Sequence, residues 1–174
     1  MHTLTERLKE TIRDIPDFPK EGIVFKDISP ILKDASLMKA ITNSFAEGVS
    51  GKVDVVVGME SRGFIFGAPL AMSLNAAFVP ARKPGKLPYK TIGVDYALEY
   101  GTNRLEMHTD AIQPGQRVLI VDDLLATGGT ARATVELVRQ LKGEIAGCCF
   151  VIELDFLKGA EELPGIPVHS LLHY

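Results

Sequence analysis

The sequence contains no tryptophan and only two cysteines, and it has no long apolar run. The cysteines, Cys148 and Cys149, are adjacent, and neighbouring strand residues point to opposite faces, so a disulfide between them is not expected. Both are expected to be small buried hydrophobes. No apolar stretch approaches the roughly 18 residues of a membrane span, and the charged start lacks a signal-peptide core. These absences predict a cytoplasmic protein with no membrane partner.

The chain also lacks a surplus of positive charge. It has 19 Lys and Arg against 22 Asp and Glu, a net charge of −3 and a pI near 5.8. A nucleic-acid partner usually requires a basic face, so none is expected. The balance of 46% hydrophobic and 24% charged residues over 174 residues is typical of one globular domain, residues 1–174.

Two common nucleotide-binding motifs are missing as well. No G-x-x-x-x-G-K-[ST] string occurs, and no G-x-G-x-x-G follows a predicted strand. The histidines form no ligand cluster in the sequence, so neither a zinc site nor a protein-held metal is expected; they are His2, His108, His169 and His173.

Helical signals are clear near the start of the chain. Thr3 and Glu6 have the spacing of a capping box, followed by apolar residues every four positions. Ser36 is the expected cap of a second helix, whose shared apolar face comprises Leu37, Ile41 and Phe45. Between the two helices, the Pro-rich residues 16–32 predict an ordered segment without a long regular element.

From residue 53 onward, apolar runs alternate with helical patterns. Strands are predicted at 53–59, 76–82, 117–123, 144–154 and 167–174, helices at 63–74 and 129–142, and a long loop with a short hairpin at 83–108. Near-continuous aliphatic strands separated by helices favour an α/β fold with a mostly parallel sheet, flanked by helices on both faces.

The stretch "VLIVDDLLATGGT" carries the chemistry. Asp122 and Asp123 end a buried strand, at the sheet edge where ligands bind in open α/β folds. Residues 127–130 (Thr-Gly-Gly-Thr) open the next helix, where free amides and the helix dipole favour a phosphate. The two carboxylates are poor phosphate ligands but good acceptors for paired sugar hydroxyls. The stretch therefore predicts a site for a phosphorylated ribose.

The same stretch resembles the phosphoribosyl-pyrophosphate (PRPP) motif of the type I phosphoribosyltransferases, and "DDLLATGGT" resembles the form found in enzymes that use adenine. Three further segments agree with the family: "FPKEGIVFKDISPIL", "GMESRGFIFG" and "RKPGKLP…DYALEYG". The resemblance implies the type I phosphoribosyltransferase fold, with a small N-terminal hood (about residues 1–34) and a flexible catalytic loop. It also implies transfer of a phosphoribosyl group from PRPP to adenine, giving AMP and pyrophosphate in purine salvage.

The resemblance assigns site residues by segment. The 5′-phosphate and ribose are assigned to Asp122, Asp123, Ala126, Thr127, Gly128, Gly129 and Thr130. Pyrophosphate is assigned to Ser61, Arg62, Gly63, Arg82, Lys83, Lys86 and Tyr100. A cis peptide before Ser61 is implied as well. Adenine is assigned to Phe25, by stacking, and to the backbones of Val24 and Lys26, while Glu99 is the implied proton-transfer residue.

The resemblance further implies Mg²⁺, held mainly by PRPP and water, and a homodimer. Two alternatives stay open. One is an enzyme of the same fold for a 6-oxopurine or orotate; the 6-oxopurine enzymes typically carry an aspartate where this chain has Ala126. The other is a non-catalytic PRPP-sensing regulator, which is expected to carry a DNA-binding extension or a basic face.

Overall fold

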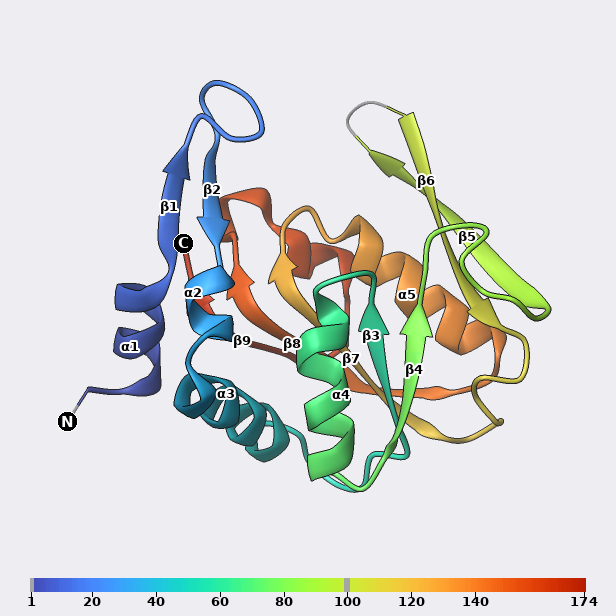
Figure 1. The fold of residues 1–174 in the computed structure, drawn as a ribbon. Coiled ribbons are helices and arrows are strands. Elements are labelled where there is room, and N and C mark those ends of the chain that lie inside the picture. The colour runs from blue at the N-terminus through green and yellow to red at the C-terminus, as the bar shows by residue number, and fades with distance from the viewer. Residues whose placement is uncertain (1, 99–100) are drawn as a thin grey trace.

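The computed structural model describes residues 2–98 and 101–174. Its centre is a five-stranded sheet in the order β4-β3-β7-β8-β9 (Figure 1). The strands are β3 (Val55–Met59), β4 (Ala77–Ala81), β7 (Arg117–Leu125), β8 (Glu144–Glu153) and β9 (Val168–His173). Every neighbouring pair is parallel, which confirms the predicted α/β class and parallel sheet.

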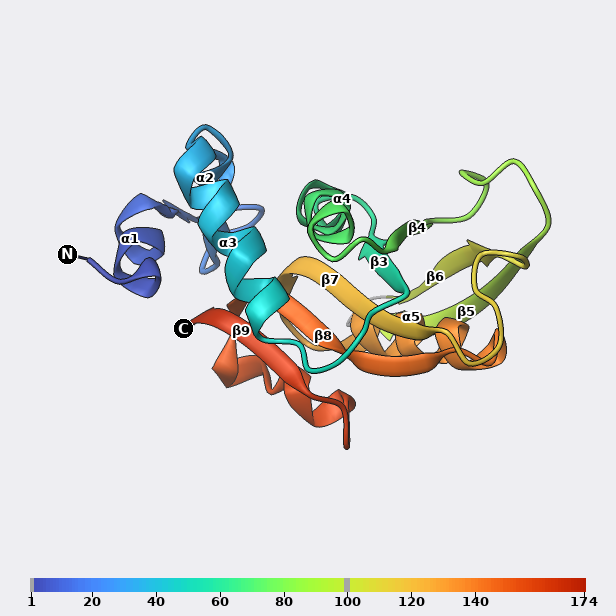
Figure 2. The ribbon, with the colours of Figure 1, turned by 90° about the horizontal axis from the view of Figure 1, so that it is seen from below.

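Helices cover both faces of this sheet, as predicted (Figure 2). One face carries α3 (Ala35–Glu47) and α4 (Gly63–Ser73), and the other carries α5 (Gly129–Gln140). Alternate strand residues supply the two cores: Val56 and Cys149 belong to the cluster under α3 and α4, whereas Val57 and Cys148 belong to the cluster under α5. Within the described ranges, no helix combines the length and apolar character needed to cross a bilayer.

The first helix, α1 (Leu4–Thr11), begins at the predicted capping box. The Glu6 amide donates to Thr3 Oγ1 at 3.2 Å, and the Thr3 amide donates to Glu6 Oε2 at 2.7 Å. The cap predicted for α3 was wrong. Asp34, rather than Ser36, accepts hydrogen bonds from the first-turn amides, because the helix already includes Ser36.

Between α1 and α3 the chain forms short elements. An antiparallel hairpin joins β1 (Arg13–Pro16) to β2 (Val24–Asp27), and α2 (Ser29–Leu32) follows. The hairpin is a separate sheet that rises beside the carboxyl ends of the central strands (Figure 1). Its strands have four residues each, consistent with the predicted absence of a long regular element.

The segment predicted as a long loop with a short hairpin is more regular than expected. It forms β5 (Thr91–Leu98) and β6 (Gly101–His108), paired antiparallel along their full length. The hairpin packs on α5 through apolar side chains such as Leu105 and Met107. The sequence did not predict this contact, because the segment begins with basic residues and prolines that are typical of a loop. It rises on the same side of the sheet as the β1–β2 hairpin (Figure 1).

The connections leave the centre of the sheet in opposite directions. The chain runs from β3 through α4 to β4, and from β7 through α5 to β8 and then, by way of η1 (Asp155–Leu157) and η2 (Gly159–Glu162), to β9. Because β3 and β7 are neighbours, the topological switch point lies between them. Open α/β sheets bind ligands outside the carboxyl ends of the strands at such a point.

The cysteines provide a direct test of the core. Both thiols are buried, and burial raises the pKa of each to about 12. Because the thiolate is the reactive form, we expect native protein at pH 8 to react with Ellman's reagent many times more slowly than protein in guanidinium chloride, which should titrate two thiols. Rapid labelling of the native protein would contradict this packing.

Candidate active site

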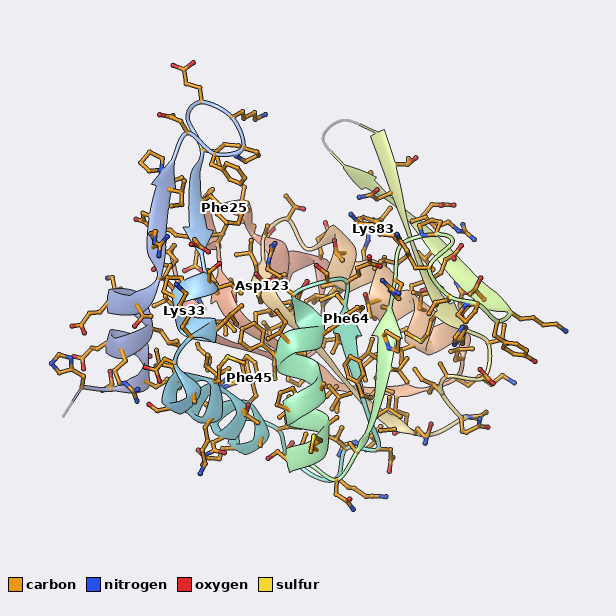
Figure 3. All side chains as sticks on the ribbon, viewed as in Figure 1. Phe25, Lys33, Phe45, Phe64, Lys83 and Asp123 are labelled. Carbon is orange, nitrogen blue, oxygen red and sulfur yellow. The ribbon has the colours of Figure 1, made fainter. Side chains whose placement is uncertain are left out.

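A polar cavity opens at the switch point. Its volume is about 290 Å³, and it is lined by Glu60, Ser61, Arg62, Lys83, Asp122 and Asp123. The register pairs Gly58 of β3 with Val121 of β7, so the residues that follow both strands meet at one edge. Figure 3 shows Asp123 and Lys83 on this side of the molecule, with Phe25 of the β1–β2 hairpin facing the same space.

The predicted phosphate loop borders a second, smaller cavity of about 80 Å³, lined in part by residues 124–131. Gly128 is the N-cap of α5, with φ of 84°, and as a glycine it has no side chain to cap the helix. A Cβ at Gly128 would collide with the carbonyl of Gly159 and would lie 2.9 Å from Glu162 Cβ, so glycine is required there. The first amides of α5 therefore have no side-chain cap and are available to an anion.

The loop after β3 approaches the end of β7 closely. The peptide between Glu60 and Ser61 is cis, as the family resemblance implied. A Cβ at Gly63 would lie 2.6 Å from the carbonyl oxygen of Val121 and 3.1 Å from Asp122 Oδ1. Only glycine allows α4 to begin this near to the carboxylate pair.

The two carboxylates differ in environment. Asp123 is 5% exposed, and its Oδ2 accepts a hydrogen bond from Arg62 Nε at 2.5 Å. Asp122 accepts from the Asp123 amide at 2.9 Å. Burial, and next the charge of Asp123, raise the pKa of Asp122 well above its usual range. The pair is thus a high-energy arrangement in which Arg62 offsets part of the negative charge.

Of the cations predicted for pyrophosphate, the structure brings Arg62 and Lys83 to the polar cavity. Arg82 lies behind it, with Nε 3.2 Å from Glu60 Oε2, and its Nη1 contacts the Lys86 carbonyl at 3.5 Å. Although burial acts in the opposite direction, the Lys83 amide and Arg82 lower the pKa of Glu60. Arg82 and Lys86 therefore do not line the cavity in this conformation. No local pattern in the sequence indicated that Glu60 pairs with Arg82.

The predicted base segment occupies β2. Phe25 stacks edge-on against Phe18 with ring centroids 5.2 Å apart, and Arg62 Cζ lies 5.9 Å from the Phe25 ring centroid. Val24 is 52% exposed, and Lys26 turns to the opposite face of the strand. Phe25 is therefore the side chain of this segment that faces the carboxylate pair.

Two predicted residues, Glu99 and Tyr100, lie outside the described residues. The same hairpin nevertheless supplies a contact that sequence reasoning missed. The hydroxyls of Tyr96 and Thr130 are 3.4 Å apart, within hydrogen-bond distance, and Tyr96 is 7% exposed. No local signal marks Tyr96, because only the packing of β5 on α5 places it beside the phosphate loop.

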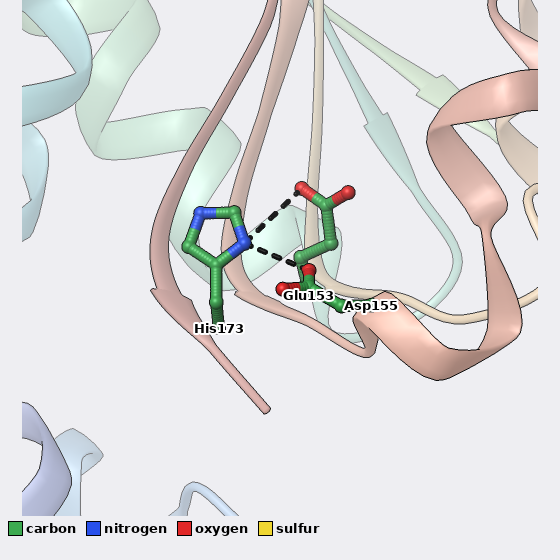
Figure 4. A group of neighbouring side chains, drawn as sticks. All are labelled: Glu153, Asp155 and His173. Atoms are coloured by element: carbon green, nitrogen blue, oxygen red, sulfur yellow. Dashed lines mark hydrogen bonds and ion pairs between the residues drawn. The ribbon is translucent and has the colours of Figure 1, made fainter.

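A second polar cluster lies away from the switch point (Figure 4). His173 Nδ1 is 2.9 Å from Asp155 Oδ1 and 3.9 Å from Glu153 Oε2, and the Ser170 hydroxyl donates to Glu153 at 2.6 Å. The hydrogen bond with Asp155 raises the pKa of His173. The sequence did not indicate this group, because Glu153 and His173 are brought together only by the pairing of β8 with β9.

Comparison with known proteins agrees with this geometry. A model of the phosphoribosyl transferase domain matches residues 29–164. An adenine phosphoribosyltransferase of Acidobacterium capsulatum is 59% identical over 97% of this chain and 94% of its own. That of Methylococcus capsulatus is 59% identical over 97% and 99%.

Solved structures agree as well. The adenine phosphoribosyltransferase of Thermoanaerobacter pseudethanolicus superposes with a TM-score of 0.95 at 52% identity, over 99% of this chain and 100% of that one. The chain belongs to the adenine phosphoribosyltransferases, a branch of the phosphoribosyltransferase family. It is therefore a pentosyltransferase with the type I phosphoribosyltransferase fold, as the sequence predicted. The Saccharomyces cerevisiae relative, solved with adenine and an imino-altritol bisphosphate, has a TM-score of 0.93 at 43% identity over 97% and 98% of the two chains.

The raised pKa of Asp122 predicts a conflict between stability and substrate binding. A carboxyl whose folded-state pKa lies above its unfolded value destabilises the fold when ionised, and this cost is lost as pH falls through the folded pKa. We expect Asp122→Asn to raise the melting temperature at pH 7, with the gain shrinking toward acid pH. We also expect it to raise the KM for PRPP roughly tenfold, the effect of losing about 1.5 kcal/mol from a charged hydrogen bond.

The control is Asp110→Asn, which changes an exposed carboxylate away from the cavity and should leave both quantities unchanged. Differential scanning calorimetry and steady-state kinetics provide the two readouts. A lower melting temperature for Asp122→Asn at pH 7 would contradict the proposed electrostatic cost.

Proposed function

We propose that this chain transfers the phosphoribosyl group of PRPP to adenine, giving AMP and pyrophosphate. The observation that carries the proposal is the meeting, at one sheet edge, of a helix start without a side-chain cap, a carboxylate pair and a polar cavity. Relatives named for this activity are 59% identical, and the yeast relative was solved with adenine.

The two cavities support the proposed assignment of the sugar phosphate. The 5′-phosphate binds the amides and hydroxyls of residues 126–130, and the ribose hydroxyls bind Asp122 and Asp123. Cleavage of the bond to pyrophosphate develops positive charge on the ribose ring. The carboxylates stabilise that charge, because they are held in place beside it before the reaction begins.

The pyrophosphate assignment is supported by charge and shape. Ser61, Arg62 and Lys83 line the polar cavity, and Gly63 allows the backbone to come close. Arg62 is shared between Asp123 and the leaving group, since its Nε is bonded to the carboxylate while its other nitrogens remain available to oxygen acceptors. Arg82 and Lys86 serve the pyrophosphate only after a rearrangement or from a second subunit. Tyr100 is proposed as a further contact of the pyrophosphate.

Adenine is proposed to stack on Phe25 and to be read by the backbone of Val24 and Lys26. The position of Phe25 beside Arg62 supports this, because it places the base next to the carboxylate pair that holds the ribose. Bond formation to adenine requires that the attacking nitrogen loses its proton. Glu99 is proposed to assist that transfer.

Mg²⁺ is proposed as the cofactor, bound mainly by pyrophosphate oxygens and water. The donor set fits a hard cation, because Glu60, Asp122 and Asp123 bring carboxylate oxygens to the polar cavity. When bound, the ion offsets the negative charge of the leaving pyrophosphate. A homodimer in the cytoplasm is proposed from the family resemblance. The surface of α4 supports the dimer, since Met72 is 84% exposed and Ile65 is 39% exposed.

A base-selection assay tests the activity. The protein is incubated with PRPP, Mg²⁺ and adenine, hypoxanthine, guanine or orotate in turn, and nucleotide formation is followed by chromatography. We expect AMP from adenine, no product from the other three bases, and loss of turnover when EDTA removes the metal. Turnover of another base without AMP formation would establish one of the alternative enzymes, and PRPP binding without any turnover would establish a regulator.

The proposed role of Glu99 is tested by Glu99→Ala. Because general acid–base catalysis contributes about 10²–10⁴-fold, we expect kcat to fall by at least roughly 10²-fold while the Kd for PRPP changes little. Thr102→Ala, an exposed substitution on the same hairpin, is the control and should retain kcat. An equal loss of PRPP binding would make Glu99 a structural residue instead.

A further inference from the structure

The hairpin that carries the proposed base segment has little support of its own. The strands β1 and β2 form a two-stranded sheet separate from the central one, and isolated two-stranded hairpins are marginally stable in water. Large side chains on it are open to solvent, including Phe18 at 51% and Val24 at 52% exposure. Its position relative to the active site therefore depends on side-chain contacts with the core.

Two such contacts act on successive residues of β2. Arg62 Cζ lies 5.9 Å from the Phe25 ring centroid, and Lys26 Nζ lies 3.8 Å from the Tyr174 ring centroid. Successive strand residues point to opposite faces. One contact therefore holds β2 from the side of the carboxylate pair, and the other holds it from the side of β9.

An ion pair and partial burial hold Lys26 in place at its contact with Tyr174. Lys26 Nζ also pairs with Asp14 Oδ1 at 2.7 Å, and its side chain is only 15% exposed. An ammonium over an aromatic face is stabilised most when it is shielded from water. The Lys26 ammonium that contacts the Tyr174 ring is therefore also held by Asp14 on the neighbouring strand β1.

Tyr174 is fixed to the edge of the central sheet. Its amide donates to the Glu153 carbonyl at 3.0 Å, and its carbonyl accepts from the Asp155 amide at 2.9 Å. The preceding residue, His173, is held by Asp155 at 2.9 Å (Figure 4). The backbone that carries the Tyr174 ring is therefore held to the central sheet by hydrogen bonds.

A cavity lies beside this contact. A cavity of about 660 Å³ separates β2 from η1, lined in part by Val24, Lys26, Leu154, Phe156 and Tyr174. Across such a cavity apolar packing provides little resistance to movement of the strand. The Lys26–Tyr174 contact therefore carries a large share of the restraint on this face.

We propose that Tyr174 is a positioning residue for adenine recognition: its ring, through Lys26, fixes the strand whose Phe25 and backbone contact the base. The proposal rests on the proposed function for its kinetic consequence, but its structural part does not. Loss of the ring leaves the PRPP cavities untouched, because no Tyr174 atom lines either of them. The effect is therefore selective for the base.

The test compares Tyr174→Leu with Tyr174→Phe. Leucine keeps apolar bulk but has no aromatic face, so we expect the KM for adenine to rise roughly fivefold, the equivalent of about 1 kcal/mol, with the KM for PRPP and the melting temperature nearly unchanged. Phenylalanine keeps the face and should restore the KM for adenine. A parallel rise in both KM values, or failure of Tyr174→Phe to rescue, would overturn the proposal.

A second measurement does not depend on the substrate. Hydrogen–deuterium exchange of the ligand-free protein should show faster exchange in residues 24–27 for Tyr174→Leu, and unchanged exchange in α5. Unchanged exchange in residues 24–27 would overturn the positioning role even if adenine is turned over normally. If the unaltered protein fails to use adenine while the exchange difference is present, the proposed function fails and the structural restraint stands.

Discussion

Parallel pairing between β3 and β7 is the constraint on which the rest of the site depends. The pairing brings Gly58 level with Val121, so the polar residues that follow the two strands lie together at the carboxyl edge of the sheet. Chain connections then diverge, with α4 on one face and α5 on the other, and the polar cavity opens at the edge between them. The close approach of Gly63 to Val121 shows how tightly the two strand ends are joined.

This edge concentrates charge that the fold tolerates only through compensation. Asp122 and Asp123 are adjacent, and burial, followed by the charge of Asp123, raises the pKa of Asp122. Arg62 offsets part of it from the start of α4, and Arg82 does the same for Glu60 on the opposite side of the loop. Such an arrangement is costly in the free protein, and carboxylates with strongly perturbed pKa values gather at functional sites.

Two hairpins flank this edge without belonging to the central sheet. The β5–β6 hairpin packs firmly on α5 and delivers Tyr96 to the phosphate loop. The β1–β2 hairpin lies outside the central sheet, and its contacts with the core include those of Phe25 with Arg62 and of Lys26 with Tyr174. The β5–β6 side of the site is thus anchored in the core, whereas the β1–β2 side lies outside the central sheet.

The sequence by itself determined the order of the elements, the parallel sheet and the residues of the PRPP motif, because aliphatic periodicity, glycines and paired carboxylates act locally. Even the capping of α1 follows from two residues three positions apart. It did not determine that Asp34 caps α3, that the basic segment forms a long hairpin, or that Arg82 turns toward Glu60. Those outcomes, like the meeting of Lys26 with Tyr174, join residues far apart in the chain. Only the packing of the finished fold decided them, since the energy of each contact depends on neighbours that the local sequence does not contain.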